Sequence, residues 1–459
     1  MGYAARTIVA RAAASVAAAP AVSSNGTATA GSLMAKGLPA VTKTPLNVYA
    51  PVAKWLIGTS GLVVGMVHIG GVTRLTKSGL SMTDWKPLGS MPPLNDAEWN
   101  DEFDRYKLFP EYQQRKSMTL DEFKYIFFWE WGHRMLGRVV GLCFALPWGY
   151  FTLRGKIPPG YQKRMAMLFT MGGTQGLVGW WMVKSGLGED RRDDRKEIRV
   201  SPYRLAAHLG MAAATYSALV WTGLGVIQLP NESRLRDLAS SMSKSAMSHA
   251  RKLRFGALGV TKLAALTMLS GAFVAGNDAG NAYNTFPLMD EKLVPMDDMI
   301  DPSLEPSYRN AFENTAMVQF NHRWLGTTTA FSAIGLACFG FIHPAARSLT
   351  TTTPQVRVGL AALGTAAVGQ MSLGVVTLLN YVPITLAAGH QLGSLVVLTS
   401  GLYTVHSLRY AAPSLLRVSK TKVMAAGTSG AVASAGKASI EGVTVVGKDM
   451  AVAASKLLK

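Results

Sequence analysis

Eight apolar blocks, each long enough to cross a bilayer as a helix, alternate with polar segments along this chain. A membrane-spanning helix needs about 20 predominantly apolar residues. The blocks lie at 53–73, 122–151, 163–184, 203–228, 255–276, 314–342, 357–380 and 384–407. The pattern predicts an all-α membrane protein with eight transmembrane helices.

The polar segments between the blocks differ in charge on the two sides of the predicted membrane. On one side, residues 74–122 hold seven Lys or Arg against nine Asp or Glu, and residues 277–313 hold two against eight. On the other side, residues 229–254 hold six basic residues against two acidic ones. Basic loops stay on the side of synthesis, which is the matrix for a mitochondrial protein. Both chain ends are therefore expected on the matrix side.

Composition supports a membrane protein and argues against other classes. Of the 459 residues, 49% are hydrophobic and only 16% are charged. The net charge is +19, but the basic residues flank apolar blocks instead of forming an aromatic-rich basic surface, so no nucleic acid partner is expected. Cys143 and Cys338 both lie in apolar blocks. They are expected to be small buried hydrophobic residues, not part of a disulfide or a metal site.

The two ends of the chain differ from its centre. Residues 1–45 carry Arg6 and Arg11 among Ala, Ser and Thr without any acidic residue, which is typical of a mitochondrial transit peptide, although the composition also fits a chloroplast leader. Residues 411–459 are rich in Ala, Gly, Ser and Lys and hold few large apolar residues. This composition predicts a flexible tail on the matrix side.

The second block carries the densest set of candidate functional residues. Its sequence DEFKYIFFWEWGHRMLGRVVG (121–141) places Glu130, His133, Arg134 and Arg138 inside an apolar, aromatic-rich run. Ionisable groups at membrane depth are costly unless they face a bundle interior, each other or a cofactor. Glu130 and His133 share one helix face because they are three residues apart.

A histidine motif occurs twice in the chain. HRMLG is repeated as HRWLG, and AAHLG resembles AAGHQLG; these segments lie at 133–137, 322–326, 206–210 and 387–393. Gln175 and Gly179 likewise match Gln370 and Gly374. The repeat predicts two related four-helix bundles within residues 46–228 and 255–410, joined by a matrix linker at 229–254.

Each predicted bundle holds a pair of facing histidines at similar depth from the acidic side. The pairs are His133 with His208 and His322 with His390. This arrangement favours bis-histidine heme ligation over structural packing. A zinc or copper site would need further close ligands, for which the sequence offers no candidates.

The remaining histidines have different expectations. His343 and His406 lie at the opposite ends of their blocks and His249 lies in a basic loop, so all three are expected to be interfacial or exposed to solvent. His68 lies near the acidic-side end of the first block, and its role stays open.

The two halves differ at one position that matters for chemistry. Three residues before His133 stands Glu130, whereas three residues before His322 stands Gln319. Only the first half therefore offers an acid–base group beside its histidine, as an enzyme with one working site would require. The alternative is a structural carboxylate paired with Arg134 or Arg138, which are within helical reach.

Several segments together resemble heme A synthase of the mitochondrial type. They include GGVTRLTKSGLSMTDWKPLG (70–89), EFKYIFFWEWGHRMLGRVVG (122–141), GAFVAGNDAGNAYNTFPLM (271–289) and MVQFNHRWLGTTT (317–329). The resemblance covers roughly residues 52–407. It implies an oxidoreductase of the mitochondrial inner membrane that converts the C8 methyl of heme O to the formyl group of heme A for cytochrome c oxidase.

The resemblance also implies a role for each candidate residue. Glu130 becomes the essential acid, and Arg134 and Arg323 become candidates to meet heme propionates. The histidine ligands divide into His133 and His208 for the substrate heme, and His322 and His390 for a heme B cofactor. Implied partners are membrane lipid, a ferredoxin-type donor on the basic matrix loops, heme O synthase, cytochrome c oxidase assembly factors and a second copy of the chain.

Two other functions remain open from the residues alone. A diheme cytochrome that carries electrons across the bilayer would place its ligands at two depths and gives Glu130 no task. A transporter or assembly scaffold would tolerate loss of the histidines. Replacement of Glu130 separates these three functions.

Overall fold

The computed structural model describes residues 48–188 and 198–412, which belong to one compact unit. The predicted leader at 1–45 and nearly all of the predicted tail at 411–459 lie outside the described residues. Within the described part the chain is helical, and its only β contact is an isolated bridge between Met289 and Lys292. The all-α prediction is confirmed for this part of the chain.

All eight predicted blocks coincide with long helices. Their bounds are α1 Ala50–Leu75, α4 Leu120–Leu153, α5 Gln162–Lys184, α6 Pro202–Gln228, α8 Lys244–Gly276, α10 Thr315–Ile342, α12 Pro354–Leu379 and α13 Ile384–Ser407. Shorter elements connect them: α2 Asp96–Lys107, α3 Pro110–Gln113, η2 Leu229–Asn231, α7 Glu232–Ser241, η3 Ala279–Asn281, η4 Ser307–Arg309, α9 Asn310–Glu313, α11 Pro344–Thr352 and η5 Arg409–Ala411.

Six helices of the described residues are long and apolar enough to cross a membrane, which makes this a multi-pass membrane protein. They comprise α1, α4, α6, α8, α10 and α12. The helices α5 and α13 have 23 and 24 residues but are not among the six. Their mean hydropathy is lowered by polar residues such as Gln175 in α5 and His390 and Gln391 in α13.

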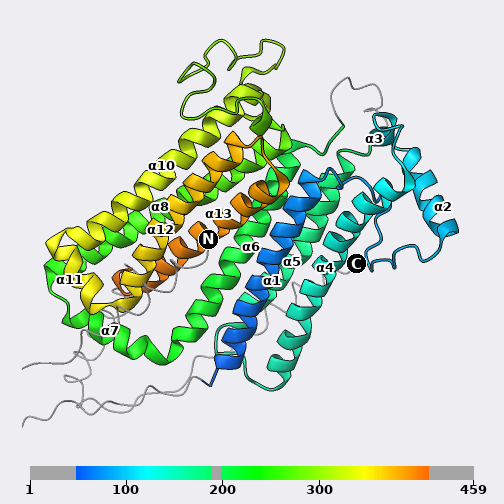
Figure 1. Cartoon of the computed structure of the whole chain (residues 1–459). Helices are drawn as coiled ribbons and strands as arrows, with labels where there is room; N and C mark the ends of the chain where they lie inside the picture. Colours follow the sequence, from blue (N-terminus) through cyan, green and yellow to red (C-terminus); the bar gives the residue numbers. More distant parts are fainter. Residues whose placement is uncertain (1–47, 189–197, 413–459) are drawn as a thin grey trace, which may run out of the picture. The chain divides into compact units, whose positions relative to one another are not determined.

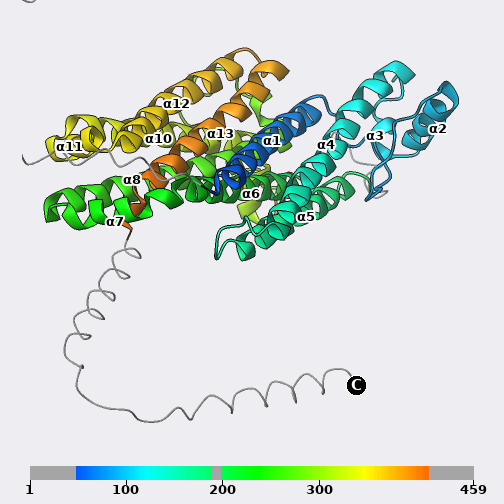
Figure 2. The same ribbon diagram turned by 90° about the horizontal axis from the view of Figure 1, so that it is seen from below.

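The long helices pack mainly with neighbours from their own half of the chain. In the first half, α1 packs against α4 and α6, and α5 packs against α6. In the second half, α8 packs against α10 and α13, and α12 packs against α10 and α13. Helices α6 and α13 join the halves through contacts with α8 and α1, and Figures 1 and 2 show these central helices side by side.

The contact between the halves is largely apolar. Its buried residues are Val67, Tyr216, Val220, Met268, Leu395 and Leu398. Polar contacts also join the halves: Gln391 Nε2 donates to the Val67 carbonyl at 3.1 Å, and the hydroxyls of Tyr216 and Thr399 lie 2.5 Å apart. Arg74 and Arg199 form ion pairs with Asp278 at 3.0 and 2.6 Å. Gly71 leaves room for the Gln391 amide, because a Cβ there would lie 1.8 Å from Gln391 Oε1 and would displace that side chain.

An aromatic cluster fastens the first acidic segment to the beginning of α4. Helix α4 begins with a capping box in which Thr119 and Glu122 bond each other's backbone amides. In this cluster Phe103 of α2 stacks on Phe123 at 5.0 Å, and Met82 is among its buried members. Burial and the neighbouring Glu111 raise the pKa of Tyr106 in the same cluster. The cluster thereby fixes the loop next to Glu130.

Three expectations about individual regions were wrong. Helix α8 begins at Lys244 rather than 255, so His249 lies on a helix and not in a loop. His406 is only 4% exposed and packs edge-on against Trp221, with ring centroids 5.0 Å apart. Cys143 and Cys338 are exposed rather than buried, since they lie on outward faces of α4 and α10.

Candidate functional site

Each of the four histidines of the repeat lies against a glycine of a neighbouring helix. A Cβ built on Gly70 or Gly179 would lie 2.9 or 2.8 Å from Cε1 of His133 or His208. In the second half, a Cβ on Gly271 or Gly374 would lie 3.2 or 2.7 Å from Cε1 of His322 or His390. At Gly70, Gly179 and Gly374 a Cβ would lie closer to the imidazole than real Cβ atoms do, so glycine permits this approach, whereas at Gly271 a small shift would be enough. The glycines at 70 and 271 were not recognised from the sequence as contacts of the histidines.

The second histidine pair fits a metal held between two imidazoles. The rings of His322 and His390 have centroids 6.3 Å apart and an interplanar angle of 85°. A histidine nitrogen binds a first-row metal such as zinc at about 2.0–2.1 Å. An iron bound at a similar distance by one nitrogen of each ring gives about the observed separation of ring centres. Nδ1 of both rings is buried without a hydrogen-bond partner in the described part of the chain.

The first pair has similar surroundings. Nδ1 of His133 is also buried without a partner in the described residues, whereas Gln175 Nε2 lies 3.2 Å from Nδ1 of His208. Gln175 Nε2 donates to the His208 carbonyl at 3.1 Å, and Gln370 Nε2 donates to the His390 carbonyl at 2.9 Å. The two glutamines paired by the sequence repeat therefore make the same contact in both halves.

Glu130 is almost completely buried and accepts hydrogen bonds from three groups. It is 2% exposed. Its Oε2 accepts from the Ser81 hydroxyl at 2.8 Å and from the Met82 backbone amide at 2.7 Å, and its Oε1 accepts from Arg134. The sequence also allowed a purely structural role in which Glu130 pairs with Arg134, and this pairing is present. A buried carboxylate with these donors is held in a fixed position beside His133.

Arg134 and Arg138 hold the loop that follows α1 against α4. Arg134 donates to the carbonyls of Met82 and Asp84, both at 2.9 Å. Arg138 Nε donates to the Pro87 carbonyl at 3.0 Å. The contacts of Arg134 occupy donors that were predicted to meet a heme propionate, and the propionate role of Arg134 remains a prediction.

The second half repeats this construction with one reversed hydrogen bond. Arg323 donates to the Tyr283 carbonyl at 2.7 Å and to the Leu288 carbonyl at 3.1 Å. Gln319 also donates to the Tyr283 carbonyl, at 3.1 Å, whereas Glu130 accepts from the Met82 amide. Nε of Arg323 is buried without a partner in the described part of the chain, so it retains a donor for an anionic group.

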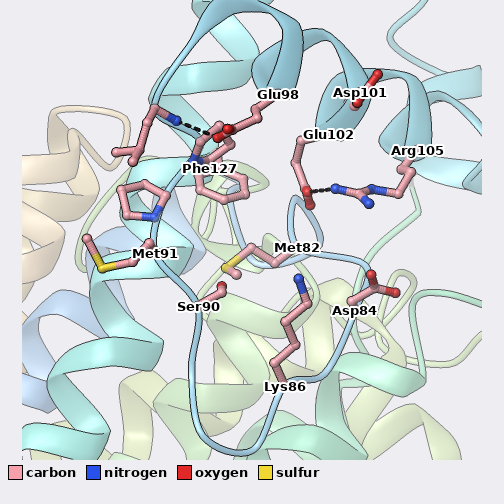
Figure 3. Close-up of a pocket in the computed structure, with 13 residues that line it drawn as sticks. Met82, Asp84, Lys86, Ser90, Met91, Glu98, Asp101, Glu102, Arg105 and Phe127 are labelled. Atoms are coloured by element: carbon pink, nitrogen blue, oxygen red, sulfur yellow. Dashed lines mark hydrogen bonds and ion pairs between the residues drawn. The ribbon is translucent and has the colours of Figure 1, made fainter.

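A separate pocket lies on the other side of the Met82 loop, between that loop and α2 (Figure 3). Its volume is about 230 Å³, and carboxylates of Asp84, Asp101 and Glu102 line it together with Lys86. Neither Glu130 nor any of the four histidines lines this pocket. The pocket is therefore distinct from the histidine sites.

Ser81 is the site residue that the sequence interpretation missed. It lies in the quoted segment 70–89 but carries no recognised motif, and 49 positions separate it from Glu130. Only the fold of the loop over α4 brings the two together. Its small polar side chain among apolar residues was a signal too weak to single it out.

The fold and the site together define a class of protein. Paired buried histidines on facing helices of a multi-pass membrane protein are the arrangement used for bis-histidine heme ligation. Residues 53–402 match the family described as cytochrome oxidase assembly protein. The chain belongs to this family.

Curated relatives agree with the family match. Heme A synthase COX15 of Arabidopsis thaliana is 46% identical over 368 residues, which cover 79% of this chain and 76% of the relative. Heme A synthase COX15 of Homo sapiens is 45% identical over 360 residues, or 78% and 82% of the two chains. The heme A synthase-mitochondrial ferredoxin fusion protein of Schizosaccharomyces pombe is 43% identical over 369 residues, covering 76% of this chain and 59% of the fusion.

Proposed function

We propose that this chain is a heme A synthase, which oxidises the C8 methyl of heme O to the formyl group of heme A. The observation that carries the proposal is the pair of matching histidine sites of which only one has a carboxylate. Glu130 lies in the first half, and Gln319 takes its place in the second. Relatives at 45–46% identity with the name heme A synthase support the same activity.

In this proposal the protein has eight transmembrane helices arranged as two repeat-related bundles. The matched contacts of Gln175 with His208 and of Gln370 with His390 support the repeat. Helices α5 and α13 complete the bundles, and their polar residues make contacts within the protein: Gln175 donates to the His208 carbonyl, and Gln391 donates to the Val67 carbonyl of α1. The charge of the loops supports an inner-membrane orientation with both ends in the matrix.

The first bundle binds heme O as the substrate, with His133 and His208 as iron ligands. The conversion of methyl to formyl is a four-electron oxidation: each of two hydroxylations would need a two-electron external oxidant and an oxygen source, and the geminal diol would then lose water to leave the aldehyde. Glu130 acts as the proton-handling group, because it is the carboxylate nearest His133 along α4. Arg134 donates a hydrogen bond to Glu130 and holds this carboxylate in place. Arg134 is also proposed to bind a heme propionate.

The second bundle holds heme B between His322 and His390. When bound, heme B supplies electron-transfer chemistry. The ring separation of 6.3 Å and the unpartnered Nδ1 atoms support this assignment. Arg323 is the candidate for a heme propionate, since its buried Nε lacks a partner in the described part of the chain.

A ferredoxin-type protein is the proposed electron donor. The fusion protein of Schizosaccharomyces pombe joins a heme A synthase to a mitochondrial ferredoxin in one chain. The basic end of the helices offers complementary charge to an acidic donor. Heme O synthase, other cytochrome c oxidase assembly factors and a second copy of this chain are further proposed partners.

Heme extraction from the purified full-length protein tests the proposal. The wild type is compared with Glu130→Ala and, as a matched control in the other half, Gln319→Ala. We expect heme A in the wild type and in Gln319→Ala, and heme O without heme A in Glu130→Ala. Heme B alone in all three proteins, despite a supply of heme O, would instead support a diheme cytochrome.

A further inference from the structure

Ser81 makes the shortest side-chain contact with the Oε2 atom of Glu130. Its hydroxyl is 2.8 Å from Glu130 Oε2 and 3.2 Å from the Ile126 carbonyl oxygen. The residue is 1% exposed. A serine hydroxyl has one proton to donate and two lone pairs to accept with. It can therefore donate to only one of these two acceptors at a time.

The internal repeat shows that this serine accompanies the carboxylate. Met82 and Tyr283 occupy equivalent positions in the two halves. The Met82 carbonyl accepts a hydrogen bond from Arg134, and the Tyr283 carbonyl accepts one from Arg323. Gly70 and Gly271 precede these two residues by the same number of positions. The equivalent of Ser81 is therefore Ala282. The half without the carboxylate also lacks the hydroxyl.

A buried carboxylate that gains and loses a proton needs a neighbour that suits both states. The Met82 amide and Arg134 can only donate hydrogen bonds to Glu130. When Glu130 carries a proton, that proton needs an acceptor, and a hydroxyl can change from donor to acceptor by rotating. The Ile126 carbonyl then receives the serine proton, so no buried donor is left unpaired.

We propose that Ser81 is a positioning residue for Glu130: its hydroxyl donates to the carboxylate and turns to the Ile126 carbonyl when Glu130 is protonated. This inference rests on the proposed heme A synthase function. Ser81 acts through Glu130 and does not contact the reacting carbon. Its loss should therefore slow turnover without removing heme from either histidine pair.

The test compares Ser81→Ala, Ser81→Thr and Ser81→Cys in the full-length protein supplied with heme O. Ser78→Ala is the matched control, since Ser78 is 0% exposed in the same loop and its hydroxyl pairs with Thr76. Turnover to heme A, heme content and the infrared band of the Glu130 side chain are measured. The band is identified by its loss in Glu130→Gln.

We expect Ser81→Ala to lower turnover about 10- to 100-fold, as loss of an outer-shell partner typically does, with heme content unchanged. Ser81→Thr should restore most of the activity because it keeps a hydroxyl. The Glu130 band should shift in Ser81→Ala and stay in place in Ser78→Ala. If Ser81→Ala loses its hemes, Ser81→Cys fills the same space with a weak donor and replaces it in the comparison.

Two results would overturn the inference. One is wild-type turnover in Ser81→Ala. The other is equal impairment of the Ala and Thr variants with an unchanged Glu130 band, which indicates a purely structural role. Failure of the wild type to make heme A refutes the proposed function instead, and the infrared comparison still tests the contact between Ser81 and Glu130.

Discussion

Replacement of Gly374 by alanine should selectively weaken heme binding at the site proposed between His322 and His390. A Cβ at this position would lie 2.7 Å from Cε1 of His390, whereas ordinary contact begins at 3.4 Å. The imidazole must therefore retreat by about 0.7 Å. Metal–ligand distances in proteins hold within about ±0.2 Å, so His390 cannot follow this shift and remain a ligand.

The energetic cost follows from the same displacement. Overpacking of a closely packed site costs typically about 1–3 kcal/mol, and every 1.4 kcal/mol is about tenfold in affinity. We expect heme binding at the second pair to weaken about 10- to 100-fold. Alanine is the better helix former, by about 0.8–1.0 kcal/mol over glycine, so weaker binding would not reflect a weaker α12.

Absorption and electron paramagnetic resonance spectra of the purified protein provide the assay. If His322 and His390 hold a heme, displacement of His390 should change the low-spin signal of that heme or remove it, while heme bound in the first bundle should be unaffected. Gly369→Ala is the control on the same helix, because a Cβ there meets nothing within 4 Å. Gly271→Ala is the graded control, since its 3.2 Å contact with His322 requires a shift of only about 0.2 Å.

The reasoning would be refuted by a Gly374→Ala protein with the heme content and low-spin spectrum of Gly369→Ala. Equal losses in Gly374→Ala and Gly271→Ala would also count against it. In that case the distance between the added Cβ and the imidazole would not determine how well the histidine binds the heme iron.

Two further changes test the basic surface proposed to bind the ferredoxin-type donor and the contact between the two halves of the chain. Reversing the exposed charges of Arg251 and Lys252 on α8 to Glu should slow reduction by ferredoxin and weaken its salt dependence, measured by stopped-flow absorbance, because steering acts mainly on association; an unchanged rate would place the donor elsewhere. Gln391→Leu removes the bond to the Val67 carbonyl and should cost about 1 kcal/mol. The thermal midpoint of the purified protein should fall accordingly, and a midpoint at or above the wild-type value would show that this bond adds no stability.

The long helices and the candidate histidines could be predicted from the pattern of residues along the chain. Long apolar blocks can bury their backbone polar groups in lipid only as helices or closed barrels, so the block pattern was enough to locate all eight long helices. The sequence also shows the repeated motifs around His133 and His322. It shows that Gln319 stands in the second half where Glu130 stands in the first. The family match over residues 53–402 agrees with that interpretation.

The groups that surround Glu130 and the glycines that lie against the histidines are defined by the folded chain and could not be predicted from the residue pattern. The partner Ser81 lies 49 positions away, in a loop with no helical or strand period. The burial of His406 likewise depends on Trp221 from another helix. The spacing of apolar residues predicts which face of a helix is apolar. It does not predict which segment, distant in the sequence, packs against that face. Such contacts depend on how the loops and helices pack, and their geometry exists only in the folded chain.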